Sequence, residues 1–124
     1  MSASRTADQL QPPYYAVVFT SRRTDVDSEG YSRTAARMEE LAREQPGFLG
    51  IESARGADGV GITVSYWQSR EAIAAWKQHV EHLTAQATGR RQWYTSYRLR
   101  IARVETDYDF TKPEGDPSNV GDGA

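Results

Sequence analysis

Apolar and polar residues alternate with two different periods along the chain, and the two periods follow each other in a definite order. Four runs rich in β-branched and aromatic residues predict strands, and two segments with apolar residues at helical spacing predict helices. In chain order the predicted elements are strand 14–21, helix 31–45, strand 48–55, strand 60–67, helix 70–88 and strand 97–110. This βαββαβ order predicts an α+β, ferredoxin-like fold, in which a four-stranded antiparallel sheet carries both helices on one face.

Turn and cap signals separate these elements. Pro46-Gly47 ends the first helix, the Gly-Ala-Asp-Gly run at 56–59 predicts a hairpin turn, and Ser69 is a good cap for the second helix. The short connections favour the ferredoxin-like arrangement over a looser α+β sandwich.

The two ends of the chain differ in composition from the part between them. Residues 1–12 are polar and predict a flexible N-terminal arm. Residues 111–124 are dominated by Gly, Pro and Asp and predict a disordered C-terminal tail. The folded unit is therefore expected to be a single domain over residues 13–110.

The apolar pattern also predicts a partner for the sheet. Along the third strand, apolar and aromatic residues alternate with Gly, Thr and Ser, so neither face carries the charges of a solvated sheet. The last strand is about 14 residues long against a usual ~5–6, and its apolar residues change phase, which predicts a bulge or bend near Ala102. We expect Val104, Tyr108 and Phe110 to lie against a second subunit, in a homodimer whose sheets pack face to face.

The composition excludes several classes of function. The chain has 124 residues, and its 15 Lys and Arg against 17 Asp and Glu give a net charge of −2, unlike a general nucleic-acid binder. It has no Cys, which excludes thiol nucleophiles and Cys-ligated metals and suits a reducing cytoplasm. No run approaches the roughly 18 apolar residues of a membrane span, and the start lacks the apolar core of a signal peptide. We therefore expect a cytoplasmic protein that binds neither nucleic acid nor membrane.

His79 is the candidate catalytic residue. It lies three residues after Trp76 and four before Leu83 on the second predicted helix, on the flank expected to face the sheet. Its ordinary pKa is near neutrality, so it could act as a base or ligand in a cavity, or could pack between helix and sheet with one hydrogen bond. His82 lies nearby, but no convergent third ligand is evident, and no metal site is expected.

Aromatic side chains are the candidate walls of such a cavity, because Trp and Tyr can orient a polar ligand atom in apolar surroundings. The substrate-binding candidates are Phe19, Tyr66, Trp67 and Trp76. The chain has no glycine-rich phosphate loop and no Gly-x-Ser-x-Gly elbow, so motifs alone name no reaction.

Three segments together resemble the antibiotic biosynthesis monooxygenase (ABM) family. They are Pro-Gly-Phe at 46–48, Tyr-Trp-x-Ser-x-Glu-Ala-x-x-x-Trp at 66–76, and residues 89–105 leading into the last strand. The resemblance covers about residues 14–110 and implies a dimeric α/β barrel. It also implies a choice among oxygenases that oxidise aromatic polyketides or quinols without metal or flavin, heme-degrading enzymes, and members of unknown role.

The heme-degrading branch of that family has an Asn on the first strand, a Trp on the second helix and a His ten residues after that Trp. Trp76 matches the Trp, whereas Gln86 falls at the His position and the first strand has no Asn. The sequence therefore departs from the heme branch at two of the three positions. A heme bound by His79 as axial ligand would need a different geometry.

The resemblance and the residues together give three expectations of function. The first is a small cofactor-independent monooxygenase-like enzyme acting on an electron-rich aromatic or quinol substrate, with His79 as the base. The alternatives are a non-catalytic dimeric ligand-binding or stress-related module and a heme-binding or heme-degrading protein.

Overall fold

The structure, a computed structural model, describes residues 10–87 and 93–113, apart from the side chains of residues 81–87. In chain order its elements are β1 (Tyr14–Arg23), α1 (Ser28–Arg43), β2 (Phe48–Arg55), β3 (Val60–Trp67), α2 (Arg70–Ala87) and β4 (Tyr94–Val104). This order confirms the βαββαβ prediction, and β2 and β3 have the predicted bounds. The predictions for residues 1–9, for the 114–124 part of the tail and for the side chains of His82, Leu83 and Gln86 lie outside the described residues.

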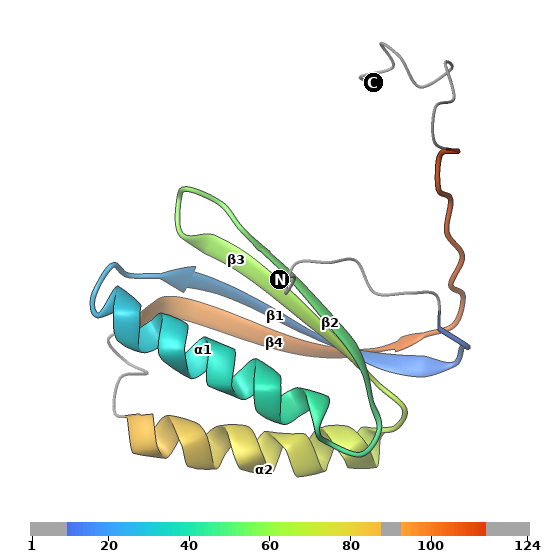
Figure 1. Cartoon of the computed structure of the whole chain (residues 1–124), viewed down its shortest axis with the longest axis horizontal. Coiled ribbons are helices and arrows are strands. Elements are labelled where there is room, and N and C mark those ends of the chain that lie inside the picture. The colour runs from blue at the N-terminus through green and yellow to red at the C-terminus, as the bar shows by residue number, and fades with distance from the viewer. Residues whose placement is uncertain (1–9, 88–92, 114–124) are drawn as a thin grey trace.

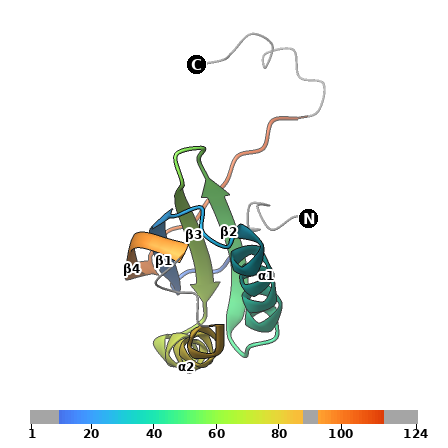
Figure 2. The same ribbon diagram turned by 90° about the vertical axis from the view of Figure 1, so that its left-hand side faces the viewer.

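The four strands form one antiparallel sheet in the order β2-β3-β1-β4. Both helices lie on the same side of this sheet (Figure 1). Seen from the end, α1 lies beside β2, and β4 lies at the opposite edge of the sheet (Figure 2). The predicted ferredoxin-like α+β fold is therefore confirmed.

The strand register decides which side chains face the helices, because directly paired residues of an antiparallel sheet share a face. Val17 packs with the helix residues Ala42 and Ile73 in the core, so its face of β1 is the helix side. Val17 pairs with Ser65 on β3, which puts Gly61, Thr63, Ser65 and Trp67 on the helix side as well. The opposite side of β3, which we call the open face, carries Val60, Ile62, Val64 and Tyr66.

The predicted cap at Ser69 is confirmed, whereas α1 begins at Ser28, earlier than the predicted residue 31. The Asp27 carboxylate caps α1 by accepting a hydrogen bond from the Gly30 N–H at 3.1 Å, and the Ser69 hydroxyl caps α2 by accepting from the Ala72 N–H at 3.1 Å. Gly47 has φ of +85°, and a Cβ there would lie 2.7 Å from the Cβ of Ala72. Only glycine fits this turn, which brings the start of β2 against α2.

The last strand differs from its prediction. β4 ends at Val104 instead of Phe110, and its pairing with β1 runs without interruption from Val104 to Ser96. The predicted bulge near Ala102 is therefore wrong, and the one register shift in this pairing lies at Arg22/Arg23, at the other end. The apolar residues change phase because the chain leaves the sheet after Val104, so the residues beyond it obey no strand alternation.

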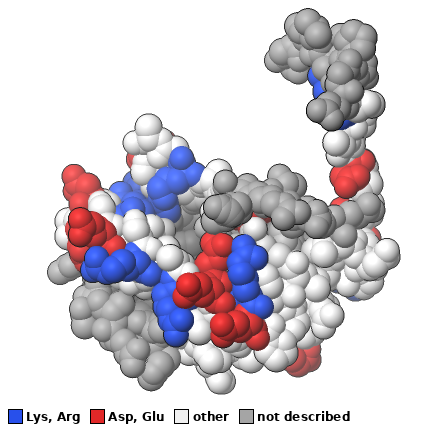
Figure 3. Space-filling view, in the orientation of Figure 1, with Lys and Arg blue, Asp and Glu red and all other residues white. Residues whose placement is uncertain are grey.

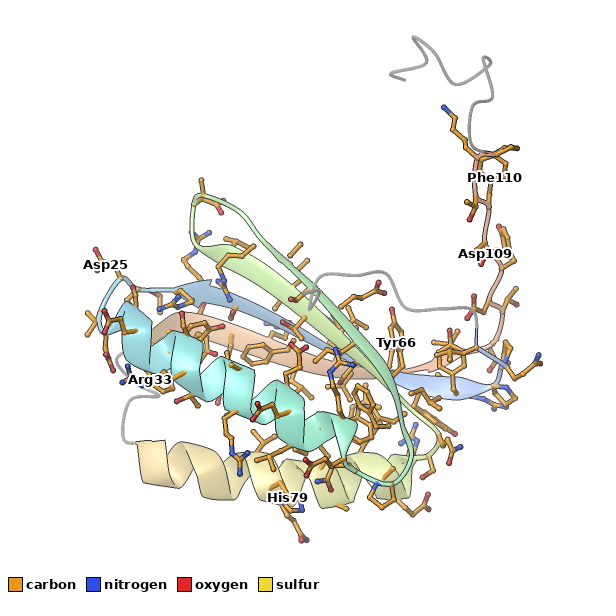
Figure 4. All side chains as sticks on the ribbon, in the orientation of Figure 1. Asp25, Arg33, Tyr66, His79, Asp109 and Phe110 are labelled. Carbon is orange, nitrogen blue, oxygen red and sulfur yellow. The ribbon has the colours of Figure 1, made fainter. Side chains whose placement is uncertain are left out.

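Residues 105–113, which we call the arm, extend away from the sheet (Figure 1). Tyr108 and Phe110 on the arm are 85% and 80% exposed, and the labelled Asp109 and Phe110 stand clear of the body of the molecule in Figure 4. On the open face Ile62 is 46% exposed. The arm and the open face thus present apolar surface that a single chain does not bury.

Charged residues have a different distribution. Arg and Glu alternate along the outer side of α1 (Figure 3), where Arg33–Glu29, Arg37–Glu40 and Arg43–Glu39 form exposed ion pairs. Such pairs contribute little to stability. The outer side of α1 is therefore a solvated surface.

Candidate functional site

Three of the residues singled out from the sequence form a stack between β3 and α2. The indole ring of Trp67 stacks on that of Trp76, with ring centres 5.9 Å apart, and Trp76 stacks in turn on the imidazole of His79 at 6.1 Å. Trp67 is fully buried, and its indole N–H donates to the Ser65 hydroxyl at 2.9 Å. Trp67 is therefore a core residue in the single chain, and Trp76 is the half-buried ring that joins the core to His79.

The expectation that His79 faces the sheet is wrong for the single chain. His79 is exposed, and in Figure 4 it projects from the side of α2 that points away from the sheet. The helix turns Ile73 and Trp76 toward the core, and a residue three positions after Trp76 falls at the edge of that stripe. A heme held by His79 would lie outside the layer between helices and sheet, so this geometry does not support a heme site there.

Tyr66 lies on the open face, away from the other three substrate-binding candidates. Its hydroxyl donates to the Glu52 carboxylate at 2.5 Å, and its ring meets the edge of the Tyr14 ring at 5.7 Å. Burial raises the pKa of Tyr66 well above its ordinary 10.0, and the hydrogen bond to Glu52 and the negative charge of Glu52 raise it further. Tyr66 and Trp67 are adjacent in sequence but point to opposite faces of the sheet, because successive residues of a strand alternate between the two faces.

Tyr14 completes this group on the open face. Its hydroxyl donates to Asp107 at 2.5 Å, and the same carboxylate oxygen accepts a hydrogen bond from the Leu10 N–H at 3.2 Å. Burial, the hydrogen bond to Asp107 and the charges of Asp107 and Glu52 raise the pKa of Tyr14 to about 12. Both tyrosines are therefore neutral hydrogen-bond donors at neutral pH, and Asp107 joins the start of the arm to β1.

Phe19 belongs to a second group on the helix side, at the end of the sheet where β1 leads into α1. Its ring lies 5.7 Å from Tyr94 and 5.4 Å from Tyr97, and the Tyr94 and Tyr97 rings are 5.7 Å apart. Tyr31 of α1 meets the edges of Trp93 at 5.8 Å and of Tyr94 at 5.9 Å. Phe19 is thus part of an aromatic cluster, although not the one predicted around Trp67 and Trp76.

Two arginines attach to this cluster through Tyr31. The Arg23 guanidinium carbon lies 3.6 Å from the centre of the Tyr31 ring, a close cation–π contact. Arg55 donates to the Tyr31 hydroxyl at 3.2 Å, to the Ser21 hydroxyl at 3.3 Å and to the Gly59 carbonyl at 2.6 Å. We call Phe19, Arg23, Tyr31, Arg55, Trp93, Tyr94 and Tyr97 the aromatic–arginine cluster.

The pKa of Tyr94 reflects its place in this cluster. Burial raises it well above 10.0, and the proximity of Tyr31 and a hydrogen bond with it add to the rise, whereas Arg55 and Arg23 act in the opposite direction. Tyr94 is therefore a neutral hydroxyl at neutral pH. Tyr94 therefore adds no negative charge beside the two arginines.

The sequence analysis does not predict the aromatic–arginine cluster as a group. Arg23 follows Phe19 and Ser21 at a spacing of two, so strand alternation places all three on one face. The sequence pattern therefore predicts that these three side chains share a face. It does not predict that Tyr31 and Trp93 lie near Arg23, because their position depends on how α1 and the segment before β4 pack against the end of β1.

The helix side of β4 is poorly covered next to this cluster. Leu99 pairs with Phe19 and Ile101 pairs with Val17, so both point to the helix side. Yet Tyr97, Leu99 and Ile101 are 44%, 54% and 47% exposed. We call these three residues the β4 strip; it is an apolar surface that continues into the aromatic cluster through Tyr97.

The structure gives no direct sign of a metal centre or a membrane segment in the part that it describes. Among the side chains that the structure describes within residues 10–80 and 93–113, no three His, Asp or Glu groups come together as metal ligands would. Of the two described helices, neither α1 nor α2 combines the length and the hydropathy of a membrane span.

Comparison with known proteins places the chain among relatives. The sequence profile described as antibiotic biosynthesis monooxygenase matches residues 15–88. The chain is 52% identical to the uncharacterized protein YqjZ of Bacillus subtilis (strain 168) over 106 residues, which cover 86% of this chain and 92% of that protein.

Solved structures share the fold at low sequence identity. A protein of Pseudomonas aeruginosa is 12% identical with a TM-score of 0.63, covering 77% of this chain and 97% of that one. SnoaB, a cofactor-independent oxygenase from Streptomyces nogalater, is 18% identical with a TM-score of 0.59, covering 86% and 99%. The profile match spans more than half of this chain and includes all of β1 but its first residue, both helices and the β2–β3 hairpin, and the chain therefore belongs to the antibiotic biosynthesis monooxygenase family.

Proposed function

We propose that this protein is a cofactor-independent monooxygenase that acts on a small electron-rich aromatic or quinol substrate in the cytoplasm. Family membership and the likeness to SnoaB support the reaction class. The observation that carries the proposal is the β4 strip, an exposed apolar surface on the helix side of the sheet that leads into an aromatic cluster. A flat aromatic molecule fits such a surface by burying its faces against rings and aliphatic side chains.

The chemistry needs no bound cofactor if the substrate itself supplies the electrons. Loss of a proton from a phenol or an activated ring methylene gives an electron-rich anion that can reduce O₂. Oxidation of one methylene to a carbonyl releases four electrons. O₂ accepts all four, with one oxygen atom entering the product and the other leaving as water. The protein then has to bind the ring, favour the anion and, where needed, take the proton.

His79 is the proposed base, and it is tested separately because in the single chain it projects away from the sheet that carries the β4 strip. It is the one described imidazole side chain, and its contact with Trp76 ties it to the stack that ends in the core. A general base contributes about 10²–10⁴-fold to a rate. His79→Ala should therefore lower kcat by at least about 100-fold; an unchanged kcat would remove His79 from the mechanism without touching the β4 strip.

Oxygen uptake with a panel of hydroquinones and anthrones tests the main proposal. Leu99→Glu places a carboxylate in the middle of the β4 strip, where it opposes both apolar contact and a substrate anion. The matched control is Val26→Glu, at an apolar residue of similar exposure, 48%, that lies before α1. We expect turnover by the wild type and by Val26→Glu and a loss of at least about tenfold in kcat/KM for Leu99→Glu. Absence of turnover with every substrate would favour the non-catalytic binding module.

We further propose that two copies associate through their open faces. The side of β3 that faces away from the helices carries Val60, Ile62, Val64 and Tyr66, and the paired positions of β1 include Ala16 and Val18. The arm adds Tyr108 and Phe110, which are too exposed for apolar residues of a stable single chain. An interface formed by both features would reach the scale of an obligate dimer, roughly 2,000 Å² or more.

A further inference from the structure

The aromatic–arginine cluster contains buried hydrogen-bond donors that meet no acceptor. Among the described residues, Nε and Nη2 of Arg23 and Nε1 of Trp93 are buried without a hydrogen-bond partner. Trp93 is only 3% exposed as a whole residue. Buried donors are nearly always paired in folded proteins, so three such atoms in one cluster call for an acceptor from outside the chain.

Tyr31 holds the two donor side chains near each other. The Arg23 guanidinium lies over the Tyr31 ring at 3.6 Å, and the Trp93 indole meets the edge of that ring with centres 5.8 Å apart. Backbone hydrogen bonds fix the same corner, from the Thr24 N–H to the Trp93 carbonyl at 2.8 Å and from the Arg23 N–H to the Gly59 carbonyl at 3.0 Å. The donors are thus held by the fold before any ligand arrives, which is the condition for a preorganised site.

The charge of the cluster specifies the acceptor. In the described part of the chain neither Arg23 nor Arg55 forms an ion pair with a carboxylate, whereas the arginines of α1 do. The Arg55 guanidinium donates to Tyr31, Ser21 and Gly59. Arg23, in contrast, has two buried donor atoms without an acceptor among the described residues and no carboxylate partner there for its positive charge. An arginine fork in aromatic surroundings is suited to a carboxylate or phenolate oxygen.

We propose that Arg23 and Trp93 bind the anionic oxygen, carboxylate or phenolate, of a planar aromatic ligand whose ring packs against the outside of the aromatic–arginine cluster. This inference deepens the proposed function, on which it rests for the identity of the ligand as substrate. It gives the substrate anion a binding partner in the protein. The β4 strip, joined to the cluster by the contact of Tyr94 with Tyr97, takes the remainder of a larger ring system.

Binding in the absence of oxygen tests the proposal without any turnover. Benzoate is the carboxylate probe, 4-nitrophenolate is the phenolate probe, and benzamide is the neutral match to benzoate. Calorimetric titration of the full-length chain should detect binding of one or both anions. The chain should bind benzamide at least about tenfold more weakly, because a neutral ligand forms no charge-assisted hydrogen bond. Which of the two anions binds more tightly distinguishes a carboxylate from a phenolate ligand.

Three variants locate the site. Arg23→Met should weaken binding of the anion by at least about tenfold. Trp93→Phe keeps a ring but removes the N–H, so it should weaken binding and abolish the ligand-induced change in tryptophan fluorescence. Arg33→Met is the matched control, because Arg33 is exposed on α1 and paired with Glu29, and it should bind like the wild type.

The outcomes are separable from those of the oxygenase proposal. Anion binding that survives Arg23→Met, or that inorganic sulfate matches in affinity, would overturn the site as an aromatic-anion site. Absence of binding by both aromatic anions would also overturn it and would leave the three donors to bound water. Binding that depends on Arg23, in a protein without oxygen uptake, would keep this site and discard only the monooxygenase reaction.

Discussion

Two pairs of tyrosines lie on opposite sides of the same sheet and are built with opposite partners. On the open face Tyr14 and Tyr66 donate to the carboxylates of Asp107 and Glu52. On the helix side Tyr31 and Tyr94 lie against arginines instead. The first pair has a negatively charged acceptor for each hydroxyl, whereas the second is surrounded by more donors than acceptors.

The difference separates a structural network from a binding site. Every hydroxyl of the open-face pair has its partner within the chain, so that network needs nothing further to be stable. The helix-side cluster leaves donors of Arg23 and Trp93 without acceptors, at a cost of about 1–3 kcal/mol for each buried group. An unsatisfied group of that cost, held by the fold, is typical of a site that a ligand completes.

The largest effect should come from removing the arm, which supplies the Tyr14 acceptor and two exposed aromatic residues. Deleting residues 104–124 removes the arm, so Tyr14 loses its acceptor Asp107 and the proposed dimer loses Tyr108 and Phe110. We expect insoluble or unfolded protein. Deleting only residues 112–124 keeps Asp107, Tyr108 and Phe110 and should leave solubility and sedimentation unchanged. A stable, soluble monomer of 13.9 kDa for the full-length chain at micromolar concentration would contradict the proposed dimer.

The next effect concerns the hydroxyl of Tyr14. Tyr14→Phe leaves the Asp107 carboxylate without this donor and should lower the free energy of unfolding by about 1.5–3 kcal/mol at pH 7. Because the folded pKa of Tyr14 is raised from 10.0 to about 12, its contribution is complete below pH 10 and is lost as the pH rises through 12. Wild type and variant should therefore converge in that window.

The neighbouring Tyr15 is the control for this experiment. It lies on the helix side of β1 against the core, and its hydroxyl makes no hydrogen bond in the described ranges. Tyr15→Phe should change stability by less than about 0.5 kcal/mol and should not alter the alkaline profile. Urea unfolding at one fixed protein concentration checks both variants, since the stability of a dimer depends on concentration. An alkaline profile of Tyr14→Phe parallel to that of the wild type would show that Asp107 does not hold this hydroxyl.

A smaller effect should distinguish the two arginines of the cluster. Arg55→Met removes three hydrogen bonds and should lower the free energy of unfolding by about 1–2 kcal/mol. Arg23→Met removes a cation–π contact but also two unpaired buried donors, so it should stay within about 1 kcal/mol of the wild type. A ligand-free Arg23→Met as unstable as Arg55→Met would mean that Arg23 is a structural residue.

The smallest effect belongs to the solvated side of α1. Arg33→Met breaks an exposed pair with Glu29, whose nitrogen–oxygen distance is 3.9 Å, and should change stability by less than about 0.5 kcal/mol. Thermal unfolding in low and high salt checks this value. A larger change would mean that charge on α1, and not only in the cluster, matters to the fold.

The sequence predicted the sheet well because its signals are local. Alternation predicted the bounds of β2 and β3, and Ser69 marked the start of α2, whereas α1 runs over Ser28–Arg43 instead of the predicted 31–45. The end of β4 was misjudged because Tyr108 and Phe110 look like strand residues, although they are exposed on the arm. Exposed apolar residues outside the sheet can show the same alternation along the sequence as apolar residues within a strand.

The candidate site was only partly predictable, for reasons of geometry. Trp67, Trp76 and His79 come together as a stack, as their spacing on β3 and α2 suggested, but His79 lies on its outer end. Tyr66 was grouped with Trp67 although adjacent strand residues point to opposite faces. The cluster around Tyr31 joins β1, α1, β2 and β4, and no short-range pattern shows four elements meeting at one corner.

The sheet order has a consequence for folding during synthesis on the ribosome. β1 is made first but lies between β3 and β4, so neither of its edges can be covered until much later segments exist. β4 begins about 70 residues after β1 ends, which is several seconds of synthesis at roughly 5–20 residues per second. A nascent β1 of aromatic and β-branched residues has two open edges until β3 is made and one open edge until β4 is made, and polysomes bring neighbouring nascent copies close together. Slower translation of the last third of the message should therefore raise the yield of aggregated chains, even though every codon still specifies the same protein.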